Sequence, residues 1–72
     1  MKTQFITGSI TYAIRGRDLL RKHGFKARME KTPNHLDRVG CGYSIIVEGD
    51  ADKAEEVLRN ARVKILGKIK LN

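Results

Sequence analysis

The residue best suited to chemistry in this 72-residue chain is its single cysteine, Cys41, which stands between Gly40 and Gly42. Glycine has no side chain, so other molecules can approach a thiol flanked in this way, and backbone amides can come close to the sulfur. The thiolate is the reactive form, and a free cysteine has a pKa of about 8.5. Two interpretations stay open: a reactive thiol, or a small apolar side chain packed in a core.

The residues before Cys41 contain groups that would change the reactivity of its thiol. Arg38 and His35 favour the thiolate through positive charge, whereas Asp37 opposes it. His35 or His23 is a conceivable base for a Cys–His nucleophile pair. No orienting carboxylate or amide is identifiable, however, and so short a chain offers little room for a deep cleft. We therefore expect a protein that is not an enzyme.

Metal binding is a weaker possibility for the same segment. Cys41, His35 and Asp37 are potential ligands, but structural zinc sites need four protein ligands at regular spacings. The chain has no Cys-x-x-Cys pair, and one cysteine cannot form an intrachain disulfide. We expect no metal, no other cofactor and a reducing, cytoplasmic location.

The composition is that of one small basic domain covering residues 1–72. The net charge is +7, and residues 1–38 hold nine Lys/Arg against three Asp/Glu. Such a charge favours anionic partners, including nucleic acid and acidic proteins. The N-terminus lacks the apolar core of a signal peptide, and no apolar run approaches the roughly 20 residues that span a bilayer. We expect no membrane association.

Hydrophobic periodicity predicts six elements. They are a strand over 2–7, a helix over 10–23, strands over 25–31 and 43–47, a helix that begins after Asp50, and a strand over 63–71. Ser9 and Asp50 are suitable N-caps for the two helices, and Glu55 and Arg59 are spaced to form an ion pair. Gly16 lies on the apolar stripe of the first helix, which indicates close packing against a strand.

This β-α-β-β-α-β order predicts an α+β ferredoxin-like sandwich, an antiparallel four-stranded sheet with two helices on one face. The first and third strands would be central. In the last strand, Ile65, Gly67 and Ile69 would share one face, and Lys64, Leu66, Lys68 and Lys70 the other. The open face would then hold an apolar centre with a basic rim, a candidate surface for homo-oligomers or partners. The residues expected there are Lys26, Arg28, Ser44, Ile46, Lys64, Leu66 and Lys68.

Three parts of the sequence are similar to a known family. They are residues 13–25 (AIRGRDLLRKHGF), the Thr32-Pro33 pair, and the Cys41-Gly42 pair before an apolar strand. Together they resemble the selenium/sulfur carrier protein-like family of small bacterial and archaeal domains, from about Phe5 to Ile69. The family commonly has arginine after the proline, where this chain has Asn34.

The resemblance implies that Cys41 carries sulfur or selenium as a persulfide or selenopersulfide, passed between donor and acceptor proteins. The supporting positions would be Pro33, His35, Arg38, Gly40 and Gly42. The alternative is a basic module that binds RNA or an acidic protein through the open sheet face. Base-specific RNA binding is not expected, since Ser44 and Ile46 stand where sheet-based RNA readers have aromatic residues.

Overall fold

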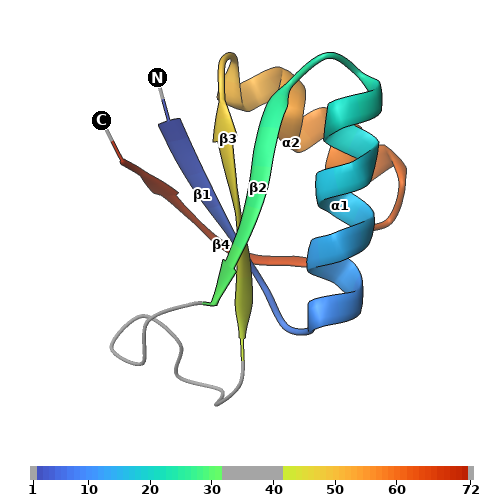
Figure 1. Ribbon diagram of the computed structural model, residues 1–72, viewed down its shortest axis with the longest axis vertical. Helices are drawn as coiled ribbons and strands as arrows, with labels where there is room; N and C mark the ends of the chain where they lie inside the picture. Colours follow the sequence, from blue (N-terminus) through green and yellow to red (C-terminus); the bar gives the residue numbers. More distant parts are fainter. Residues whose placement is uncertain (1, 32–41, 72) are drawn as a thin grey trace.

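The computed structural model describes residues 2–31 and 42–71. The element order is β1 (Lys2–Thr7), α1 (Ile10–Lys22), β2 (Lys26–Lys31), β3 (Tyr43–Glu48), α2 (Ala51–Asn60) and β4 (Ile65–Lys70). The strands form one antiparallel sheet in the order β2-β3-β1-β4, with both helices on one face (Figure 1). The predicted ferredoxin-like class and the central positions of the first and third strands are confirmed.

Both helices begin at the predicted capping residues. The Ser9 side chain accepts a hydrogen bond from the Tyr12 backbone N–H at 3.2 Å, and the Asp50 carboxylate accepts from two backbone N–H groups at the start of α2. These bonds satisfy amides that have no partner within the helix. The first helix ends one residue earlier than predicted, because His23 is the C-cap and Gly24 turns the chain with φ of +89°.

The core lies between the sheet and the helices, and Gly16 sets how closely they approach. A Cβ atom on Gly16 would lie 2.5 Å from Ile45 Cδ1 and 2.9 Å from Leu58 Cδ2, closer than van der Waals contact allows. The predicted role of Gly16 in close helix–strand packing is therefore confirmed. The largest fully buried apolar side chains of this core are Phe5, Leu20, Ile45, Val47 and Leu58.

A β-bulge in β4 overturns the predicted arrangement of its side chains. Thr7 pairs with Ile65 while Ile6 pairs with Gly67, so Leu66 is an extra residue in β4. Paired residues of antiparallel strands lie on the same face, so Ile65 faces the helices and Gly67 faces away from them. The prediction that Ile65, Gly67 and Ile69 share one face is therefore wrong. The same shift places Lys68 opposite Phe5, on the helical side rather than the open face.

The sheet face away from the helices is less exposed at its centre than predicted. Ile46 lies there, opposite Gln4 and Arg28, but only 4% of its surface is exposed. Gln4 Nε2 donates a hydrogen bond to Ser44 Oγ at 2.9 Å, and both side chains are buried. Leu66 is 46% exposed, but Ile46 is buried. Ile46 and Leu66 therefore do not form the exposed apolar centre that the sequence predicted.

Candidate functional site

The structure describes one of the six predicted site residues. Gly42 is buried and directly precedes β3. The other five, Pro33, His35, Arg38, Gly40 and Cys41, lie outside the described residues. The geometry of the candidate site therefore comes from Lys31 and Gly42, the two described residues that bracket this segment.

Four paired residues form a row across one end of the sheet. Lys31 at the end of β2 pairs with Tyr43, Tyr43 pairs with Thr7, and Thr7 pairs with Ile65. Gly42 is next to Tyr43 in the chain. The segment that carries Cys41 is thus joined to the sheet at the end where β1 leads into α1 (Figure 1).

The buried hydroxyl of Thr7 ties the elements at this end together. Thr7 Oγ1 lies 2.8 Å from the carbonyl oxygen of Tyr43 and 3.0 Å from that of Ser9. A hydroxyl has one proton to donate, so the two carbonyls share it. The start of β3, next to Gly42, is therefore held beside the start of α1.

The amino end of α1 gives this region a positive partial charge. Ser9 caps the helix through its hydroxyl oxygen, and the first turn contains no acidic residue. Backbone N–H groups at a helix start favour negative charge nearby. The start of α1 therefore favours a negatively charged group at this end of the sheet.

Within residues 2–31 and 42–71 no group of three His, Cys, Asp or Glu side chains is arranged to hold a metal ion. The potential ligands His35, Asp37 and Cys41 lie outside the described residues. In the same described parts of the chain, no helix is long and apolar enough to cross a membrane.

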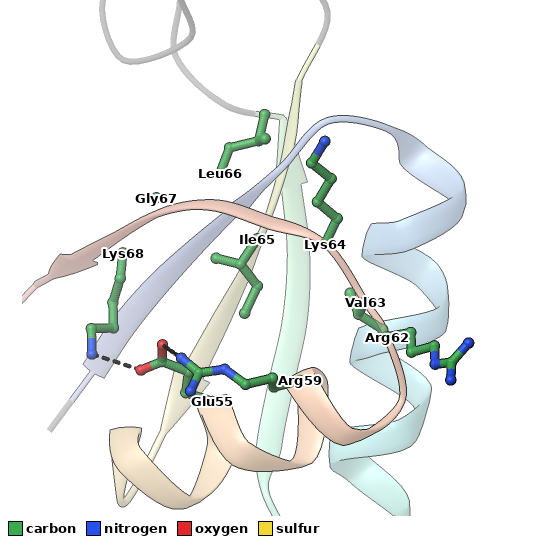
Figure 2. A pocket seen from close by; sticks show the side chains of 9 residues that line it. All are labelled: Glu55, Arg59, Arg62, Val63, Lys64, Ile65, Leu66, Gly67 and Lys68. Carbon is green, nitrogen blue, oxygen red and sulfur yellow. Dashed lines mark hydrogen bonds and ion pairs between the residues drawn. The ribbon is translucent and has the colours of Figure 1, made fainter.

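Sequence reasoning missed a cavity of about 410 Å³ between the second half of α2 and the start of β4. We define the α2–β4 groove by its lining residues, Glu55, Arg59 and residues 62–68 (Figure 2). Four of these side chains are cationic. The run of Lys and Arg after residue 58 was a signal in the sequence, but the bulge that turns Lys68 toward α2 was not foreseen.

Glu55 holds two of these cations. Its carboxylate accepts hydrogen bonds from Lys68 Nζ and from Arg59 Nη2, each at 2.8 Å (Figure 2). The Glu55–Arg59 pair was predicted and is confirmed. The hydrogen bond from Lys68 is the main cause that lowers the pKa of Glu55, against the opposing effect of partial burial. The same hydrogen bond raises the pKa of Lys68.

Comparison with known proteins identifies the family. A family model described as "Putative Se/S carrier protein-like" matches residues 5–70. The chain belongs to this family. The match confirms the resemblance seen in the sequence, and its range includes Cys41. Membership in a Se/S carrier-like family indicates interaction with donor and acceptor proteins. No curated protein and no solved structure matches the chain.

Proposed function

We propose that this protein carries sulfur or selenium on Cys41 as a persulfide or selenopersulfide. The observation that carries the proposal is family membership over residues 5–70, a range that contains the single cysteine of the chain. A carrier of this kind holds the atom covalently and hands it on, and it need not accelerate a reaction itself. The reducing cytoplasm, where thiols stay free, is the compartment that suits it.

The transfer is an exchange reaction without net oxidation. The Cys41 thiolate attacks the terminal sulfur of a donor persulfide, the donor S–S bond breaks, and the donor leaves as a thiolate. The new S–S bond on Cys41 then undergoes the same attack by an acceptor thiolate, which takes the terminal atom. A selenopersulfide donor follows the same steps with an S–Se bond.

Several features support this role for Cys41. Arg38 and His35 precede Cys41 in the sequence, and a positive charge on either would favour the thiolate. Gly42, which follows Cys41, is buried next to a central strand, so the chain beyond the thiol has a rigid anchor. The Thr7 hydroxyl holds this anchor beside the positive end of α1.

Mass spectrometry of the intact protein tests the proposal. After incubation with glutathione persulfide, we expect the wild-type protein to gain the mass of sulfur at Cys41 and the Cys41→Ser variant to gain none. A glutathione selenopersulfide donor tests selenium in the same way. The carrier proposal fails if Cys41 stays unmodified while a control protein with an exposed thiol is loaded under identical conditions.

A basic module that binds RNA or an acidic protein through the open sheet face remains the alternative. Nucleic-acid binding that weakens steeply with salt and persists in Cys41→Ser would favour it. Within the described residues, however, the aromatic side chains of Phe5 and Tyr43 pack on the helical side of the sheet. A homo-oligomer also stays a prediction, which sedimentation equilibrium would test.

A further inference from the structure

We propose that the α2–β4 groove docks an acidic polypeptide segment of a protein that exchanges sulfur or selenium with Cys41. This inference rests on the carrier function proposed above and adds to it a surface and a class of partner. Three observations carry it: the surplus of positive charge, the direction of the cations, and the position of the groove relative to Gly42.

The groove has more positive than negative charge. It contains four cationic side chains and one carboxylate, that of Glu55. Lys68 and Arg59 form ion pairs with Glu55, whereas neither Arg62 nor Lys64 has an ion pair with any residue in the described parts of the chain. Two exposed cations are therefore available to a partner of opposite charge.

The cations do not converge on one point. Figure 2 shows that Arg62 and Lys64 extend in different directions, and both point away from Glu55. A single small anion could not contact both, whereas a polypeptide with several spaced carboxylates could. Leu66 (46% exposed) and the half-buried Ile65 add apolar surface for such a chain. Apolar surface beside spaced cations suits a polypeptide with carboxylate and apolar side chains better than the evenly charged backbone of a nucleic acid, so we favour a polypeptide.

The backbone conformation at Arg62 shows how α2 ends at the groove. Arg62 follows the C-cap of α2 and has φ of +60°, the left-handed region that glycine adopts without strain. The Arg62 N–H donates to the Arg59 carbonyl and the Val63 N–H donates to the Leu58 carbonyl, each at 3.0 Å, which is the Schellman motif common at helix ends. The chain therefore turns at Arg62 and leads directly into the lining residues 63–68.

One part of the groove lies at the end of the sheet to which the Cys41 segment is joined. Its residue Ile65 belongs to the row that includes Thr7 and Tyr43, and Tyr43 follows Gly42. Leu66 Cδ1 lies 3.4 Å from the position that a Cβ atom on Gly8 would take, next to the start of α1. A polypeptide bound in the groove would therefore lie at the same end of the molecule as Gly42.

A binding experiment with matched variants tests this inference. The probe is a short fluorescein-labelled peptide of glutamates around a central leucine, measured by fluorescence anisotropy at low ionic strength. The groove variant is Arg62→Gln with Lys64→Gln. The control variant is Lys26→Gln with Arg28→Gln on the opposite edge strand β2, where both side chains are exposed and the loss of charge is the same.

We expect saturable binding to the wild-type protein, about tenfold weaker binding to the groove variant and less than about twofold change in the control. Amide NMR shifts on peptide addition should be largest over residues 62–68. The inference is overturned if the peptide does not bind, if both variants lose equal affinity, or if a single-stranded DNA oligonucleotide binds more tightly than the peptide and depends on the same residues.

Loading of Cys41 separates this inference from the carrier proposal. The groove variant should still accept sulfur from glutathione persulfide, since a small donor needs no docking. The Cys41→Ser variant should bind the peptide as the wild type does. Failure of loading in the wild type refutes the carrier role, whereas groove-independent peptide binding refutes the docking surface.

Discussion

Thr7 Oγ1 lies 2.8 Å from the carbonyl oxygen of Tyr43, a residue 36 positions later in the chain. This contact joins the end of β1 to the start of β3, and Gly42 and Cys41 directly precede that start. The same hydroxyl is 3.0 Å from the Ser9 carbonyl at the start of α1. One buried side chain thus links β1, α1 and the start of β3, which Gly42 directly precedes.

Replacing Thr7 by valine should destabilise the protein by about 1–2 kcal/mol, because it removes a buried hydrogen-bond donor and keeps the shape of the side chain. Thr3→Val is the matched control. Thr3 lies on the same strand and is also buried, but its hydroxyl has no hydrogen-bond partner among the described residues. We expect Thr3→Val to be neutral or stabilising in urea denaturation. Equal losses in the two variants would contradict the role given to the Thr7 hydroxyl.

Gly16→Ala should lower the free energy of unfolding by up to about 2 kcal/mol. Alanine improves helix propensity by about 1 kcal/mol, but its Cβ would clash with Ile45 and Leu58, and overpacking of a core costs about 1–3 kcal/mol. Thr11→Ala, at an exposed position of the same helix, should change stability by less than about 0.5 kcal/mol. A stabilised Gly16→Ala variant in thermal or urea unfolding would show that the helix can move away.

The Glu55–Lys68 pair should make stability depend on pH at both ends of the range. The pKa of Glu55 is lowered in the folded protein, so its contribution is present above its ordinary value of 4.5 and disappears as the pH falls through the lowered value. The pKa of Lys68 is raised, so its contribution is present below 10.5 and is lost as the pH rises through the raised value. Both effects should be small, because the side chains are 25% and 43% exposed.

The variant Glu55→Gln isolates this contribution. Urea denaturation should show the wild type more stable than Glu55→Gln at neutral pH, with the difference shrinking well below pH 4.5. Glu56→Gln is the control, since Glu56 is exposed on the same helix and has no ion pair with any described residue. A difference that persists unchanged in acid would mean that Glu55 acts through packing rather than charge.

Arg62→Gly should stabilise the protein by about 1 kcal/mol, since glycine adopts the left-handed conformation without the clash of a Cβ atom. Arg62→Ala should bring no comparable gain, because alanine keeps the Cβ atom. Both variants should weaken binding of the acidic peptide by a fewfold, since both remove the guanidinium. If Arg62→Gly gains stability and keeps full peptide affinity, the side chain is not part of the docking surface.

Arg38 and His35 should increase the reactivity of the Cys41 thiol. We expect Arg38→Gln to slow alkylation by iodoacetamide by a fewfold at neutral pH, because it removes a cation that favours the thiolate. His35→Gln should slow alkylation at about pH 6, where an ordinary imidazole is largely protonated. Asp37→Asn should have the opposite effect. Rates that are unchanged in all three variants would show that these side chains do not act on the thiol.

Local sequence patterns were sufficient for most of the fold. Ser9 and Asp50 cap their helices as predicted because a capping side chain bonds to amides two or three residues away. The buried positions of α1 repeat with the helical period, so Ala13, Gly16 and Leu20 could be identified from spacing. The apolar run after Tyr43 indicated a central strand, and β3 is one.

The chain by itself also determined which residue is the candidate carrier, because it has one cysteine and a family pattern around it. Only the tertiary structure decided where that segment is joined and what lies beside it. Two features depend on pairing between distant strands and on a bulge at Leu66. They are the row from Lys31 to Ile65 and the contact of Lys68 with Glu55. An extra residue in β4 reverses the faces of all that follow it, and that register is set by the neighbouring strand β1 rather than by local sequence.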